Sequence, residues 1–177
     1  MRHFRAYDLV AQGVNGSFTM QSLKCASWSP GTVQVFVYTY TGVLPSATLD
    51  PNLMTLVGQS NATAFGNMQV QTVPLTANTV IPANGKFVVE QRQIAGGPWC
   101  IASNYQGNTQ PAYIACPNGF FFPATINSYN AVGYGYMMPI QQCNGLVTSV
   151  GLPVVEQVAG IPSGGEFPIG TTQNCFN

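Results

Sequence analysis

The chain has 177 residues, of which ten are charged, five Lys or Arg against five Asp or Glu, so its formal net charge is zero. This length suits one domain with a sizeable core, and without a basic stripe the sequence argues against nucleic acid as a partner. Because the chain carries too little charge for repulsion to keep copies apart, the composition favours a protein that packs into an assembly over one dispersed in a crowded solution.

The start of the chain bears on the compartment. Met1 to Arg5 lead into polar residues without an apolar core, so as written the chain has no secretory signal, and no later stretch is apolar for long enough to span a membrane. We expect either a protein assembled inside a cell, as virion proteins are, or a processed piece of an exported one.

Taken in chain order, the sequence predicts short strands separated by turns. Thr32 to Tyr40 is rich in β-branched and aromatic residues, alternates, and lies between Gly31 and Gly42. Gly and Pro in 82–85 and 94–98 indicate turns, with Gly supplying positive φ. Further strands are predicted at 18–25, 53–58, 68–75, 86–93, 99–103, 112–116 and 134–140. With no helix of more than two turns indicated, we predict an all-β fold, an antiparallel jelly roll or β-sandwich.

Two motifs add a family resemblance. Residues 85–90 form a strand-like segment that ends in Val-Val-Glu, and residues 103–116 read Ser-Asn-Tyr-Gln-Gly-Asn-Thr-Gln-Pro-Ala-Tyr-Ile-Ala-Cys. Together with Arg2-x-Phe4, Gly16-x-Phe18 and Val33-x-Val35-x-Val37-Tyr38 upstream, they resemble a β-jelly-roll module of secreted and surface proteins of bacteria, of the adhesin type, over about residues 2–140. The family's modules lie within longer exported chains, whereas Met1 opens the module here, so export is not implied.

The loop within the second motif has two interpretations. Its amides and aromatic rings have the chemistry with which lectin-like sites bind neutral sugars, by hydrogen bonds and stacking. Asn and Gly also build rigid turns without any ligand, and we favour that structural interpretation. The candidate ligand residues are Asn104, Tyr105, Gln106, Asn108, Gln110 and Tyr113.

The five cysteines include no C-x-x-C pair, and their odd number leaves at least one without a partner in the chain. Cys100 and Cys116 are candidates for a disulfide in an oxidising compartment, and in a reducing one the cysteines would serve as small buried apolar residues. We expect no metal site and no cofactor, because His3 is the only histidine and the acids are dispersed.

Few groups are present that could carry catalysis. His3 lies near a chain end, where mobility is common, and a glycosidase would need two acids at one cleft, such as Glu90 with Asp8 or Asp50. Glu90 and Arg92 share one strand face and are more simply an ion pair. We therefore expect a protein that is not an enzyme.

The last part of the chain differs from the rest. We place the sandwich at 1–142 and a C-terminal extension at 143–177, either a final edge strand or an arm that pairs with a neighbour's sheet. Consecutive Phe residues in a strand point to both faces, so at least one is covered or exposed for a partner. The candidate interface residues are Phe120, Phe121, Phe122, Leu146, Val150, Leu152 and Val154.

These observations predict a structural subunit that contacts copies of itself or other subunits. It would lie in the outer layer of a phage or virus particle, as a decoration or spike protein, or in an extracellular fibre or adhesin on a cell surface. A module that binds neutral carbohydrate through residues 104–113 is the alternative function.

Overall fold

The computed structural model describes residues 1–96, 103–104, 110–116, 125–128, 138–139, 141–148, 157–159 and 175–176. In these ranges the chain is almost entirely antiparallel strand, which confirms the predicted all-β class. The one helical element described is a 3-10 turn, η1 (Pro51–Leu53), which begins where the Asp50 carboxylate accepts a hydrogen bond from the Asn52 amide at 2.9 Å. The strands are β1 (Arg2–Asp8), β2 (Ser17–Ser27), β3 (Gly31–Tyr40), β4 (Thr48–Leu49), β5 (Met54–Gln59), β6 (Thr63–Phe65), β7 (Gln69–Ile81), β8 (Lys86–Ala95), β9 (Ser103–Asn104), β10 (Ala112–Ala115), β11 (Ile126–Ser128), β12 (Met138–Pro139), β13 (Gln141–Thr148), β14 (Gln157–Ala159) and β15 (Cys175–Phe176).

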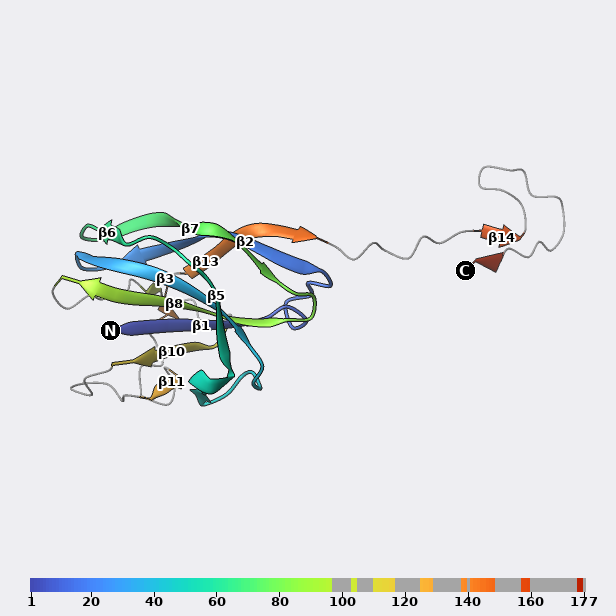
Figure 1. Cartoon of the computed structure of the whole chain (residues 1–177), viewed down its shortest axis with the longest axis horizontal. Coiled ribbons are helices and arrows are strands. Elements are labelled where there is room, and N and C mark those ends of the chain that lie inside the picture. The colour runs from blue at the N-terminus through green and yellow to red at the C-terminus, as the bar shows by residue number, and fades with distance from the viewer. Residues whose placement is uncertain are drawn as a thin grey trace.

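The strands form a sandwich of two unequal sheets (Figure 1). The large sheet has the order β4-β11-β10-β1-β8-β3-β5, with β6 also paired to β3, and the small sheet has the order β13-β2-β7. A single bridge between Ser60 and Leu75 connects the two sheets at the side where β5 and β7 lie. Two further pairs, β9 with β12 and β14 with β15, form two-stranded sheets of their own. The sandwich is thus established, and the jelly-roll connectivity implied by the resemblance stays a prediction.

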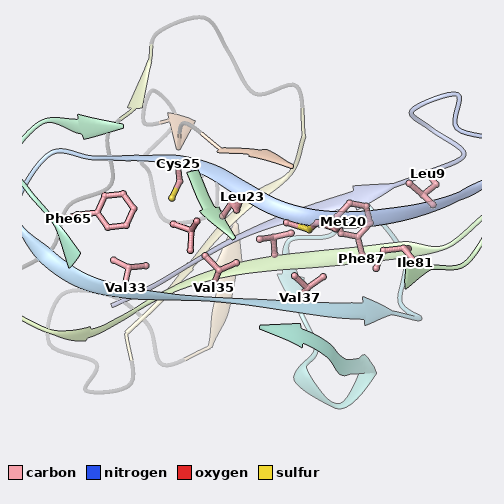
Figure 2. Packing of buried hydrophobic residues seen from close by; sticks show 12 residues of the cluster. Leu9, Met20, Leu23, Cys25, Val33, Val35, Val37, Phe65, Ile81 and Phe87 are labelled. Atoms are coloured by element: carbon pink, nitrogen blue, oxygen red, sulfur yellow. The ribbon is translucent and has the colours of Figure 1, made fainter. Parts of the chain in front are cut away.

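The main core lies between the two sheets (Figure 2). Every second residue of β3 points into it, as the alternation of Val33, Val35 and Val37 predicts. Met20 and Leu23 of β2 meet these valines from the small sheet and are fully buried. The period of two in the sequence therefore identified the core face of β3, whereas in β2 a bulge between Met20 and Ser22 interrupts the alternation.

A second core covers the opposite face of the large sheet. Phe4, Val88 and Tyr113 come from the neighbouring strands β1, β8 and β10 and are buried there with Ile126 of β11. Because β8 is buried on both faces, its sequence around Val88 is continuously apolar and does not alternate.

Three details differ from the prediction. Residues Arg2–Asp8 form a central strand of the large sheet, which is not among the strands predicted from the sequence. Strand β13 crosses the predicted boundary at residue 142: it pairs with β2 from Gln141 to Thr148, so the first residues of the predicted extension form an edge strand of the small sheet. In the turn before β8, Asn84 and not Gly85 takes the positive φ, at 59°.

Candidate interaction surface

The outer face of the small sheet carries large apolar side chains that are exposed. Residues paired across neighbouring strands point to the same side, so the register gives its composition row by row. Leu146, Thr19 and Val80 form one row, and the side chains of Leu146 and Val80 are 62% and 59% exposed. The next rows are Asn144, Ser22 and Pro74, then Gln142, Lys24 and Thr72. Large apolar side chains and a single charge thus share this face.

Strand β13 forms one edge of this sheet. It pairs with β2 on one side, and none of the other described strands pairs with its second side. The strand carries no charged residue and no proline, the two devices that commonly keep an edge strand from pairing with another chain. Among the described strands, the second side of β13 thus has no pairing partner.

Gly145 allows β13 to lie close to β2. A Cβ at this position would fall on the carbonyl oxygen of Thr19 and lie 2.9 Å from Cε2 of Phe18. We expect Gly145→Ala to lower the free energy of unfolding by about 2 kcal/mol, because backbone has to move to make room. Urea unfolding measures this. Gly66→Ala is the matched control, since a Cβ there meets only the flexible Gln69 side chain at 3.1 Å; equal losses in the two variants would contradict the expectation.

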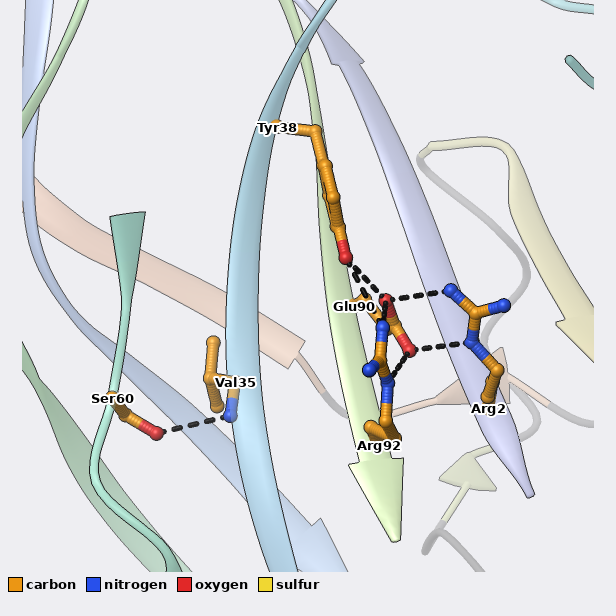
Figure 3. Close-up of polar contacts among 6 residues, drawn as sticks. All are labelled: Arg2, Val35, Tyr38, Ser60, Glu90 and Arg92. Carbon is orange, nitrogen blue, oxygen red and sulfur yellow. Dashed lines mark hydrogen bonds and ion pairs between the residues drawn. The ribbon is translucent and has the colours of Figure 1, made fainter. Parts of the chain in front are cut away.

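An ion cluster lies on the face of the large sheet away from the main core, where Tyr38 packs against the second core. Figure 3 shows the side chains of this cluster. The Glu90 carboxylate, which is fully buried, accepts hydrogen bonds from Nε of Arg2 and from Nε of Arg92, each at 2.7 Å. The hydroxyl of Tyr38 donates to the same carboxylate at 2.8 Å. The predicted pair of Glu90 and Arg92 is confirmed, and Arg2 is a partner that the sequence did not indicate.

This cluster ties together three strands. Arg2 comes from β1, Glu90 and Arg92 from β8, and Tyr38 from β3. Burial alone would raise the pKa of Glu90, but the hydrogen bonds from the two guanidinium groups outweigh it and hold this pKa below its usual value. Burial and the neighbouring carboxylate together raise the pKa of Tyr38 to about 12. At neutral pH the cluster is thus a charged, structural tie.

A set of polar side chains lies on the face of the large sheet that bears the main core. His3, Arg5 and Tyr7 alternate along β1, and Gln91 of β8 lies opposite His3 and is fully buried. Arg5 donates to the carbonyl oxygen of Gln141 at 3.4 Å, which connects β1 to the start of β13. Burial lowers the pKa of His3 to about 3, so this side chain is neutral at pH 7. The sequence had placed His3 at an often mobile chain end, and the structure corrects this: it is fixed within a central strand.

The cysteines fall into two groups. Cys25 and Cys143 lie against the main core, and burial raises the pKa of each thiol to about 12, which keeps both protonated. Cys116 follows β10 and is a free thiol in the structure. Cys100 lies outside the described residues, so its pairing with Cys116 stays a prediction.

The candidate sugar loop is only partly described. Tyr113 is corrected: it lies in β10 with its side chain fully buried in the second core, so its ring has no face for a sugar. Asn104 belongs to β9 and Gln110 precedes β10, while Tyr105, Gln106 and Asn108 lie outside the described residues.

The candidate interface is also only partly described. Leu146 is exposed on the outer face of the small sheet, as the interface hypothesis requires. Phe120, Phe121, Phe122, Val150, Leu152 and Val154 lie outside the described residues. The sequence did not point to Val80 or Lys24 as neighbours of Leu146, because the pairing of β2 with β13 places Lys24 on this face and the pairing of β2 with β7 places Val80 there.

The described acids are separated from one another. Asp8 accepts from the amides of Val10 and Ala11, Asp50 caps η1, and Glu90 is held by the two arginines. Over the described part of the chain, no three side chains of the kinds that bind metals lie together.

One described pocket is a shallow groove of about 330 Å³ between β5 and β7, lined by Leu56, Val57 and Thr79 among others. In the residues described, no helix is long and apolar enough to cross a membrane.

Comparison with family models, with curated proteins and with solved structures finds no match to this chain. The resemblance to the bacterial jelly-roll module therefore stays a prediction.

Proposed function

We propose that this chain is a non-enzymatic structural subunit that contacts copies of itself, or other subunits of an assembly, through the outer face of its small sheet. The observation that carries the proposal is the combination of exposed Leu146 and Val80 with one charge on that face and an edge strand open to pairing. Exposed apolar side chains grouped on one face are typical of interaction sites. Such a subunit would suit the outer layer of a virus particle or an extracellular fibre.

The near absence of charge supports the same role. Ten charged residues in 177 give a surface on which apolar and neutral polar contacts dominate, and repulsion between copies is weak. Of the three described acids, two cap turns and one is buried in the ion cluster, so the acids contribute little to keeping copies apart.

Placing a charge on this face tests the proposal. We expect Leu146→Glu and Val80→Glu each to weaken self-association about tenfold or more, because a carboxylate would have to be desolvated at the contact. Light scattering after size exclusion, over a range of concentrations, and negative-stain electron microscopy measure the effect. Val43→Glu is the matched control, since Val43 is 77% exposed but lies in the loop after β3.

Either of two results would overturn the proposal. A wild-type chain that stays monomeric at every concentration, alone and with its native partners, would remove the basis for an assembly role. Equal weakening by Val43→Glu would show that the added charge matters and the face does not.

A further inference from the structure

The charges of this chain are unevenly divided along the sequence. All five basic residues and three of the acids lie in residues 1–148, which gives that part five minus three, or a net charge of +2. Residues 149–177 hold Glu156 and Glu166 and no basic residue, which gives a net charge of −2. The C-terminal segment and the sandwich are therefore complementary in charge.

Lys24 is the basic side chain that the sandwich leaves available. Arg2 and Arg92 bind Glu90, Lys86 donates to the carbonyl oxygen of Gly42 at 3.0 Å, and Arg5 is buried. Lys24 is exposed on the outer face of the small sheet, and in the described part of the chain its ammonium group makes no hydrogen bond and no ion pair. An acidic partner for this face would meet Lys24.

The apolar row and Lys24 are separated by a defined distance. Leu146 lies in one cross-strand row, and Lys24 lies two rows further along, opposite Gln142. Two rows correspond to four residues of β13, or roughly 13 Å at the usual rise per residue. A ligand strand for this face thus needs an apolar residue and an acid four positions apart.

Residues 152–156 have that pattern. They read Leu-Pro-Val-Val-Glu, so that in an extended conformation Leu152, Val154 and Glu156 point to one side. Antiparallel to β13, with Leu152 opposite Leu146, Glu156 falls opposite Gln142 and within reach of Lys24. This register requires the nitrogen of Pro153 to lie on the outward side of the added strand, because proline has no N–H to donate to β13.

We propose that residues 152–156 of a second copy add to the second side of β13 in this register, with Glu156 paired to Lys24. The inference rests on the proposed function and names the partner of that surface. The same segment of the same copy does not fit: Leu152 opposite Leu146 would place residue 150 opposite Thr148, with one residue between them. A β-hairpin needs at least two loop residues, and Thr148 is held extended by its pairing with Ser17.

Charge reversal in the full chain tests this register. We expect Lys24→Glu and Glu156→Lys each to weaken self-association about fivefold to tenfold, since an attractive pair becomes a repulsive one. Mixing the two variants should restore association close to that of the wild type, because in each mixed contact an acid again meets a lysine. Sedimentation velocity over a concentration series measures all three samples. Glu166→Lys is the control and should leave association unchanged.

The outcomes separate the inference from the proposed function. If Leu146→Glu weakens association but the reversed variants gain nothing on mixing, the face is an interface and this register is wrong. If the double variant K24E/E156K recovers in isolation but the mixture of single variants does not, the pairing lies within one copy and the inference fails. A wild-type chain that never associates would overturn both.

Discussion

Lowering the pH from 7.5 to 4.5 should reduce the free energy of unfolding by roughly 2.5 kcal/mol, with His3 responsible for most of the loss. His3 is buried in β1, and desolvation, with a smaller contribution from the positive chain terminus, lowers its pKa from 6.5 to about 3. In the unfolded chain the imidazole takes up a proton near pH 6.5, whereas the folded chain resists protonation. The stabilisation is therefore complete above pH 6.5 and is lost as the pH falls towards 3.

The composition allows the pH dependence to be assigned to one side chain. His3 is the only histidine, so few other side chains titrate between pH 7 and pH 5. Urea unfolding followed by aromatic fluorescence at half-unit pH steps should show stability falling steadily below pH 6.5. His3→Gln keeps a neutral polar side chain and should make stability nearly constant down to about pH 5. An equal slope in the variant and the wild type would show that His3 is not the titrating group.

The strands that could be predicted from the sequence are those whose pattern reflects one buried face. In β3 the residues Val33, Val35 and Val37 alternate with less buried neighbours, and the turns on either side carry Gly and Pro. Strand β1 follows another rule. Its residues Arg2, His3 and Arg5 are polar, yet pairing on both sides, with β8 and β10, places it in the middle of the large sheet. Long-range pairing thus outweighs local composition there.

On the candidate surface, too, some residues could be predicted from the sequence and others depend on strand register. Leu146 could be identified from composition as an exposed apolar residue near the end of the sandwich. Val80 and Lys24 could not, because their position beside Leu146 depends on the register of β2 with both of its neighbours. Likewise, Glu90 and Arg92 are two residues apart and share a strand face, whereas Arg2 reaches Glu90 from 88 residues away.

Replacing Glu90 by Gln should cost about 3 kcal/mol of folding free energy, because removing one member of a buried ion pair leaves the other charge without compensation. The Arg2 and Arg92 side chains are 28% and 36% exposed, so solvent moderates the loss and places it at the lower end of the range for fully buried pairs. The replacement also sets an amide N–H donor among guanidinium and hydroxyl donors. Oε2 of Glu90 accepts hydrogen bonds from Nη2 of Arg2 at 3.0 Å, from Nη2 of Arg92 at 2.9 Å and from the Tyr38 hydroxyl at 2.8 Å. An amide nitrogen in the place of this oxygen cannot accept any of these bonds.

A double-mutant cycle identifies the ion cluster as the cause of this loss. Arg2→Met should destabilise the wild type but should cost little, or even stabilise, in the Glu90→Gln background, because there it removes an uncompensated positive charge. Asp50→Asn is the control at an exposed acid, where the cap on η1 is retained and little change is expected. Since the pKa of Glu90 is lowered in the folded chain, the contribution of Glu90 is complete above its unfolded pKa and is lost as the pH falls through the folded value. Additive effects of the two substitutions would show that the strands are held together without this cluster.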